Sequence, residues 1–183
     1  CTFNDYLARG RIVVDKVTEP AGSAQQFEFD PSWGANFPLT DTGTPVDSGE
    51  LLPGIYSVAE VNLPAGWSST GAVCSDGSLP AAIDLAAGET VTCTFTNTQS
   101  GRIYVDKVTD PSGSAQQFEF DPSWGINFLL ADGDTPHDSG LLAPGGYSVA
   151  EVTPLPAGWS PTSATCSDGS DPAAIDLAPG ETV

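Results

Sequence analysis

The feature that most constrains this chain is an internal repeat. The run GSAQQFEFDPSWG at Gly22–Gly34 recurs at Gly113–Gly125, and YSVAEV at Tyr56–Val61 recurs at Tyr147–Val152. Two copies this similar share one fold, so a role assigned to a residue of one copy can be checked against the other copy. The repeat predicts one domain at residues 10–100 and a second at residues 101–183.

The remaining segment, residues 1–9, resembles the end of a repeat. The first copy closes with TCTFTNT, whereas the second copy stops at Val183, before its matching cysteine. The chain opens with CTFND, which matches that missing ending. We therefore expect residues 1–9 to be the last strand of a preceding or neighbouring repeat, and the second repeat to lack its own last strand.

Apolar residues within each copy alternate with other residues at a spacing of two, which is typical of β-strands. Clear examples are Ile12 with Val14, and Phe27 with Phe29. The chain also contains 16 prolines and 20 glycines, which argue against long helices and for turns between short strands. The pattern predicts an all-β chain of two tandem antiparallel β-sandwich repeats, with about seven strands each. The short junction between them favours a rod-like arrangement.

The charge of the chain excludes several classes of partner. Lys and Arg total 5 against 24 Asp and Glu, so the net charge is −19. Almost nothing could neutralise phosphates, so we expect no binding to nucleic acid or to an anionic membrane surface. No apolar run approaches the ~18 residues that a spanning helix needs, so we expect no membrane insertion.

The four cysteines occupy matching places in the repeat. Cys74 and Cys93 lie in the first copy, Cys166 matches Cys74, and Cys1 matches Cys93. An even number at matched positions predicts disulfides in an oxidising compartment. We expect a Cys74–Cys93 bond, and a bond between Cys166 and Cys1 across a junction between repeats. Zinc is the rival interpretation, but the chain has no CxxC pair and a single histidine, so we expect no metal site.

The chain has only two lysines, Lys16 and Lys107, and they occupy the same position in the two copies. Strand alternation places Lys16 on the inward face with Ile12 and Val14. The same argument turns Glu60 and Asn97 inward from their own strands. Burying these polar groups without partners would cost several kcal/mol, so we expect them to meet or to react.

These motifs resemble the Cna B-type, or SpaA-like, prealbumin-like domains of bacterial surface proteins. The resemblance rests on RIVVDKV with its inward lysine, on LLPGIYSVAEVNLPAGW with its inward glutamate, and on TCTFTNT with its asparagine. Many members of that family form a spontaneous isopeptide bond. The resemblance therefore implies that Lys16 is the nucleophile, Glu60 the proton shuttle and Asn97 the electrophile. An unreacted buried Lys–Glu pair and a surface lysine are the alternatives.

The second copy carries the counterparts Lys107 and Glu151. Its electrophile is absent from its own body, but Asp5 lies four residues after Cys1, as Asn97 lies four residues after Cys93. Aspartate also serves as the electrophile in the family, with loss of water in place of ammonia. The resemblance therefore makes Lys107, Glu151 and Asp5 a second candidate site, formed across a junction.

These features together predict a structural repeat module of an extracellular bacterial fibre, stalk or adhesin shaft. The expected partners are copies of the chain, joined head to tail in a filament or a longer array. We expect neither enzymatic activity nor a cofactor. The single histidine, His137, aligns with Val46 of the other copy, so it cannot be a catalytic residue common to both copies. The alternative is an adhesive or ligand-binding surface module, which would use loops or an exposed face.

Overall fold

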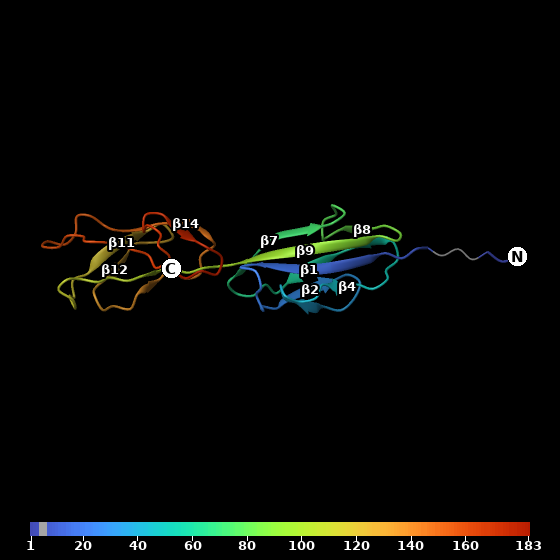
Figure 1. Ribbon diagram of the computed structural model, residues 1–183, viewed down its shortest axis with the longest axis horizontal. Helices are drawn as coiled ribbons and strands as arrows, with labels where there is room; N and C mark the ends of the chain where they lie inside the picture. The colour runs from blue at the N-terminus through green and yellow to red at the C-terminus, as the bar shows by residue number, and fades with distance from the viewer. Residues whose placement is uncertain (4–6) are drawn as a thin grey trace. The chain divides into compact units, whose positions relative to one another are not determined.

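The computed structural model describes residues 1–3 and 7–183, which contain strands and no helix (Figure 1). This part of the chain therefore holds no helix that is long and apolar enough to cross a membrane. The chain divides into two compact units, unit 1 at Cys1–Gln99 and unit 2 at Ser100–Val183. The all-β prediction is confirmed.

Unit 1 consists of short strands because its alternating apolar residues are interrupted by turns rich in Gly, Pro and Asp. The strands are β1 (Arg11–Glu19), β2 (Phe27–Pro31), β3 (Phe37–Leu39), β4 (Val46–Asp47), β5 (Gly54–Tyr56), β6 (Val58–Val61), β7 (Trp67–Cys74), β8 (Ile83–Leu85) and β9 (Thr90–Gln99). They form one sheet in the order β4-β1-β9-β7, a second in the order β3-β2-β6, and the pair β5-β8.

The first and last strands of unit 1 pair in parallel, which corrects the prediction of a wholly antiparallel sandwich. The register of β1 and β9 runs from Arg11 opposite Thr90 to Glu19 opposite Thr98. Alternating burial is the same for a parallel and an antiparallel neighbour, so the sequence pattern cannot report the direction. The other strand pairs of unit 1 are antiparallel.

The core of unit 1 is built from the inward residues of these strands. Along β1 the residues at alternate positions from Ile12 to Thr18 are buried. Aromatic side chains fill the centre, with Phe27 edge-on to Trp67 and Phe29 edge-on to Phe95 at 5.0 Å between ring centroids. The buried apolar cluster is Ile12, Val14, Phe27, Phe29, Leu39, Val58, Trp67, Cys74, Ile83, Leu85, Val91, Cys93 and Phe95.

Unit 2 repeats this plan with fewer and shorter strands. They are β10 (Tyr104–Val105), β11 (Phe118–Pro122), β12 (Phe128–Leu130), β13 (His137–Asp138), β14 (Gly145–Tyr147), β15 (Val149–Glu151) and β16 (Ile175–Leu177). The sheets are β10-β13, β12-β11-β15 and β14-β16. Residues 159–166, the counterpart of β7, form no strand, and residues 100–183 contain no counterpart of the full β9.

The difference in strand length between the two units is caused by strand pairing. The segments RIVVDKV and RIYVDKV are nearly identical, yet β1 spans nine residues and β10 only two. In unit 1, β9 lies between β1 and β7 and pairs with both. Without that neighbour, the same residues of unit 2 have no ladder of hydrogen bonds to hold them extended.

A glycine opens each repeat because the backbone there passes close to its neighbours. A Cβ atom at Gly10 would lie 2.8 Å from the Leu85 side chain and 2.9 Å from the carbonyl oxygen of Ala86. A Cβ atom at Gly101 would lie 2.8 Å from the carbonyl oxygen of Glu181. Only glycine fits at these two positions, which accounts for the repeated Gly-Arg-Ile.

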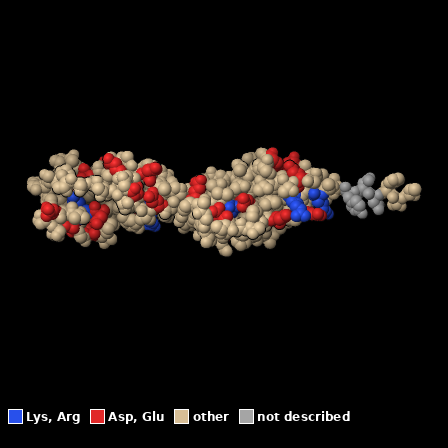
Figure 2. Space-filling view, viewed as in Figure 1, with Lys and Arg blue, Asp and Glu red and all other residues tan. Residues whose placement is uncertain are grey.

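The surface is acidic, as the composition requires. Figure 2 shows Asp and Glu side chains scattered over the visible face of both units, with only isolated basic patches. Arg11 and Arg102 each pair with an acidic neighbour from their own repeat, Arg11 with Asp47 at 3.0 Å and Arg102 with Asp138. Such exposed pairs contribute little stability, so the acidic surface acts mainly through the net charge.

The pairing argument predicts different rates of amide hydrogen exchange for matched residues of the two units. The amides of β7 should exchange slowly, because β9 holds them, whereas those of residues 160–166 should exchange at nearly the rate of an open chain. Exchange followed by mass spectrometry on peptides from the two segments measures the difference. Similar protection in both segments would contradict the argument.

Candidate functional site

The candidate site of unit 1 is a lysine buried in the core. Lys16 lies on β1 in the row of inward residues, and its side chain is 0% exposed. Its Nζ lies 4.3 Å from the centroid of the Phe27 ring, over the face of that ring. The alternation that buries Ile12 and Val14 therefore carries an amine into an apolar interior, as the sequence pattern predicts.

The Nζ of Lys16 has few polar neighbours. It donates hydrogen bonds to the carbonyl oxygens of Val17 at 2.8 Å and Phe95 at 3.2 Å. The Oε1 atom of Glu60 lies 3.8 Å away, which is an ion-pair distance but long for a hydrogen bond. Two backbone carbonyls thus hold the amine between β1 and β9.

Glu60 and Asn97 complete the cluster from two other strands. Glu60 lies on β6 and Asn97 on β9, where it is opposite Thr18 of β1. The Nδ2 atom of Asn97 donates a hydrogen bond of 2.8 Å to Oε1 of Glu60. The structure therefore brings together Lys16, Glu60 and Asn97, the three residues that the sequence singles out.

Two oxygen atoms in this cluster have no hydrogen-bond partner among the described residues. They are Oε2 of Glu60 and Oδ1 of Asn97, and both are buried. A buried polar atom without a partner is costly, and in a native core it calls for an explanation. A cluster that is packed but not fully satisfied is consistent with groups that react with one another rather than with an outside ligand.

The electrostatics of the cluster lower the pKa of the Lys16 amine. Burial lowers the pKa of Lys16 below its usual value of 10.5, and the nearby negative charges of Glu60 and Asp41 offset this effect only in part. A lowered pKa increases the fraction of uncharged amine near neutral pH. The uncharged amine is the form that can act as a nucleophile.

Unit 2 holds the matching lysine and glutamate in a more open setting. The Nζ of Lys107 lies 2.7 Å from Oε1 of Glu151 and 4.3 Å from the centroid of the Phe118 ring. Their side chains are 18% and 19% exposed, against 0% and 6% for Lys16 and Glu60. The third residue of this predicted site, Asp5, lies outside the described residues.

The cysteines of unit 1 form the disulfide Cys74–Cys93. The two residues are directly opposite each other on β7 and β9, with Cα atoms 4.0 Å apart. Cys1 and Cys166 are both free, with Cys1 exposed and Cys166 half-buried. The bond therefore ties β9 to β7 near the start of β9, while Asn97 lies near the other end of the strand.

One aspartate in each repeat has a structural role that the sequence pattern did not predict. Asp132 accepts hydrogen bonds from the backbone nitrogens of Thr109 at 3.3 Å and Gly113 at 2.7 Å, and from the Thr109 hydroxyl at 2.7 Å. Asp41 receives the matching backbone hydrogen bonds of Thr18 and Gly22. Their conservation between the two copies was the signal that could have revealed this role.

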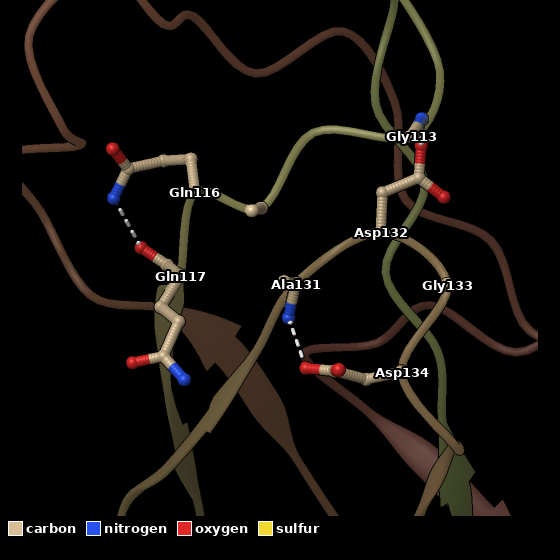
Figure 3. Close-up of a pocket in the computed structure, with 8 residues that line it drawn as sticks. Gly113, Gln116, Gln117, Ala131, Asp132, Gly133 and Asp134 are labelled. Atoms are coloured by element: carbon tan, nitrogen blue, oxygen red, sulfur yellow. Dashed lines mark hydrogen bonds between the residues drawn. The ribbon is translucent and has the colours of Figure 1, made fainter.

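The shallow surface hollow beside Asp132 is an open loop region, shown in Figure 3. Asp134 accepts a hydrogen bond from the backbone nitrogen of Ala131, and the side-chain amide of Gln116 donates to the carbonyl of Gln117. The Asp134 carboxylate thus bonds the backbone of its own turn, and that of Asp132 bonds the backbone of the turn that begins at Thr109. Among the described residues, no three His, Cys, Asp or Glu side chains gather as a metal-binding group.

Comparison with known proteins places the first repeat in a known family of domains. Residues 12–99 match the family model of a prealbumin-like fold domain, SpaA_4. No curated protein sequence matches the chain.

Two solved structures are similar to the chain at 16% sequence identity each. A streptococcal ancillary pilin matches 98% of this chain with a TM-score of 0.39. The pilus adhesin SpaC from Lactobacillus rhamnosus GG matches 82% of it with a TM-score of 0.29. The chain spans 62% of the length of the first protein and 25% of the second.

The disulfide should contribute strongly to the stability of unit 1. It closes a loop with a sequence separation of 19, so replacing both cysteines with alanine should lower the free energy of unfolding of unit 1 by about 3 kcal/mol. Urea denaturation of the Cys74→Ala/Cys93→Ala variant measures the change. Cys166→Ala is the matched control and should leave unit 1 unaffected; an equal loss in both variants would contradict a specific role for the bond.

Proposed function

We propose that this chain, whose residues 12–99 form a SpaA-like prealbumin-fold domain, is a structural repeat module of an extracellular bacterial fibre, stalk or adhesin shaft. The observation that carries the proposal is the closed cluster of Lys16, Glu60 and Asn97 in the core of unit 1. Groups sealed from solvent cannot meet a substrate or an outside ligand. They can join strands of the same domain, which is what a fibre under tension requires.

The cluster has the groups for an isopeptide bond between β1 and β9. The uncharged Nζ of Lys16 attacks the side-chain carbonyl carbon of Asn97, a new C–N bond forms, and the original C–N bond of the carboxamide breaks. Glu60 accepts a hydrogen bond from the departing nitrogen, so it is placed to pass a proton from the amine to the leaving group. Ammonia leaves, and the packed core supplies the proximity that the reaction needs.

A second bond of the same kind is proposed for unit 2. Lys107 and Glu151 already form an ion pair at 2.7 Å, and the electrophile would be Asp5 of another copy, with loss of water. Together with a Cys1–Cys166 disulfide, this bond would fix one repeat to the next. Assembly of copies head to tail, as a filament or within a longer array, follows from joining the end of one repeat to the body of another.

The composition suits this role in an extracellular setting. A disulfide within unit 1 is stable in an oxidising compartment such as the bacterial cell surface. A net charge of −19 keeps neighbouring fibres apart through mutual repulsion. The short junction near Ser100 would leave little slack between successive repeats of an extended rod.

The isopeptide bond of unit 1 is tested by the mass of the intact protein. After reduction of the disulfide, the mass of the monomeric wild-type chain, which has not formed the bond between copies, should fall below that of its sequence by one ammonia, and a peptide joining Lys16 to Asn97 should appear on digestion. Glu60→Gln should slow or abolish the loss, and Asn97→Ala should abolish it. Ser69→Ala is a matched control on β7, opposite Asn97, and should leave the loss intact. A wild-type chain whose mass equals that of the unmodified sequence would overturn the proposed bond.

The lowered pKa of Lys16 predicts a dependence of stability on pH wherever the amine stays free, as in Asn97→Ala. In the window from the lowered pKa up to 10.5, the unfolded chain binds more protons than the folded chain, so the free energy of unfolding rises with pH. The measurement is urea denaturation across this window, compared with the Lys16→Met/Asn97→Ala variant. The two variants share all other titrating groups, so a parallel response in both would contradict the prediction.

A further inference from the structure

We propose that Asp41 is a positioning residue for the Lys16–Asn97 site: its carboxylate clamps the end of β1 and places a second negative charge near the buried amine, so it sets the pH at which that amine can react. The proposal deepens the proposed function, on which it rests, by naming how the site is regulated. Asp41 has no part in the isopeptide chemistry itself, in which Glu60 passes the proton.

Asp41 follows β3 and binds the turn that leads out of β1. Its Oδ1 atom accepts a hydrogen bond of 3.1 Å from the backbone nitrogen of Thr18, and its Oδ2 atom accepts one from the backbone nitrogen of Gly22. Thr18 is buried in the same inward row as Lys16 and lies opposite Asn97 in the parallel register. The carboxylate therefore holds the stretch of β1 that faces the electrophile.

The same arrangement is present in the second repeat. Asp132 accepts hydrogen bonds from the backbone nitrogen and hydroxyl of Thr109 and from the backbone nitrogen of Gly113, and a single oxygen, Oδ2, accepts all three. Figure 3 shows the Asp132 carboxylate directed toward Gly113. The Thr109 hydroxyl, the Gly113 nitrogen and the charge of Lys107 all act to lower the pKa of Asp132. An aspartate that clamps this turn thus accompanies the lysine in both copies.

Two carboxylates act on Lys16 in the part of the chain that the structure describes. They come from different elements, Glu60 from β6 and Asp41 from the segment after β3. The other neighbours of the amine are the Phe27 ring and two backbone carbonyl oxygens, which carry no charge. Each negative charge favours the protonated amine and so opposes the effect of burial. The protonation of Lys16 therefore depends on the balance between burial and these two carboxylates.

The two carboxylates are bound differently, which suits them to different tasks. Oε1 of Glu60 accepts a hydrogen bond from Asn97, and its Oε2 is buried with no partner among the described residues. Both oxygens of Asp41 accept backbone N–H groups instead. Glu60 is thus free to take up a proton and pass it on, whereas the backbone holds Asp41 as a fixed negative charge.

A fixed negative charge near Lys16 controls the start of the reaction. The ammonium group must lose one proton before its nitrogen can attack the side-chain carbonyl carbon of Asn97. Asp41 stabilises the ammonium form, so it moves this loss to a higher pH. After the C–N bond has formed and ammonia has left, Lys16 carries no charge, and the backbone hydrogen bonds of Asp41 still support its carboxylate.

The test is an NMR titration of lysine in chains that cannot form the bond. The chain has two lysines, Lys16 and Lys107, so labelling lysine with carbon-13 gives two Cε signals, which Lys107→Arg assigns. In Asn97→Ala/Asp41→Asn, the midpoint of the Lys16 titration should shift to lower pH than in Asn97→Ala, because one negative charge is lost. The Lys107 signal is the internal reference, and its midpoint should be the same in both chains.

Two control variants remove a charge elsewhere. Asp41→Asn keeps an oxygen acceptor for the turn, and Asp132 shows that one oxygen can serve both backbone nitrogens. Asp30→Asn removes an exposed charge from β2, and Asp132→Asn removes the matching charge from unit 2. Both controls should leave the Lys16 midpoint unchanged. An unchanged midpoint in Asp41→Asn, or an equal shift in Asp30→Asn, would overturn the proposal.

The rate of bond formation separates the charge of Asp41 from its clamp. Chains recovered unfolded in guanidinium are diluted into reducing buffers of different pH, and the loss of ammonia is followed by mass spectrometry. Asp41→Asn should move the midpoint of the rate profile to lower pH and keep the plateau within about twofold of wild type. Asp41→Ala, which also removes the clamp, should lower the plateau by roughly tenfold.

The outcomes distinguish this proposal from the proposed bond. A lowered plateau with an unmoved midpoint in Asp41→Asn would mean a purely structural role and would refute control by charge. Equal plateaus in Asp41→Ala and Asp41→Asn would refute the clamp. A purified wild-type chain with the mass of the unmodified sequence would refute the bond itself, whereas the NMR titration is made in chains that lack Asn97 and reads the effect of Asp41 on Lys16 directly.

Discussion

The pairing of β9 with β1 is the interaction on which the rest of unit 1 depends. β9 lies inside the four-stranded sheet, carries Cys93 to the disulfide, and brings Asn97 to Glu60, the acidic neighbour of Lys16. Unit 2 acts as a natural comparison, because it has nearly the same sequence but only the first rung of that pairing. There the counterpart of β1 shrinks to two residues and the counterpart of β7 forms no strand. Local strand propensity is therefore insufficient at these positions, and the neighbouring strand decides whether they are extended.

The sequence predicted those features that depend on alternation and failed on those that depend on pairing. Alternation correctly turned Lys16, Glu60 and Asn97 inward, because a period of two assigns each residue to one face. It could not reveal that β1 and β9 run parallel, since both directions give the same burial pattern. It also missed the role of Asp41, whose partners, Thr18 and Gly22, lie across a turn rather than on the same strand. Comparison of the two copies located candidate residues, and only the three-dimensional structure identifies the atoms that they contact.

The setting of the cluster explains why a chain with a buried amine and carboxyl need not be a catalyst. A catalytic site must admit a substrate, and its acid and base must be regenerated after each turnover. Lys16 and Asn97 are almost wholly buried, and the Phe27 ring covers the amine. A bond formed here would consume both partners and stay in place. Desolvation lowers the pKa of Lys16. In an open binding pocket, an amine with a lowered pKa could react repeatedly with incoming substrates. In a closed core, it can take part in only one reaction per domain.

The proposed bond also has a mechanical consequence that follows from the parallel register. The chain enters unit 1 at the start of β1 and leaves at the end of β9, so a pull along these strands shears the hydrogen bonds between them. A link from Lys16 to Asn97 joins the two strands close to the exit at Gln99. Tension would then pass from Arg11 along β1 to Lys16, across the link, and out through Asn97. The chain between residues 17 and 96, which includes the disulfide and most of the core, would lie outside that path.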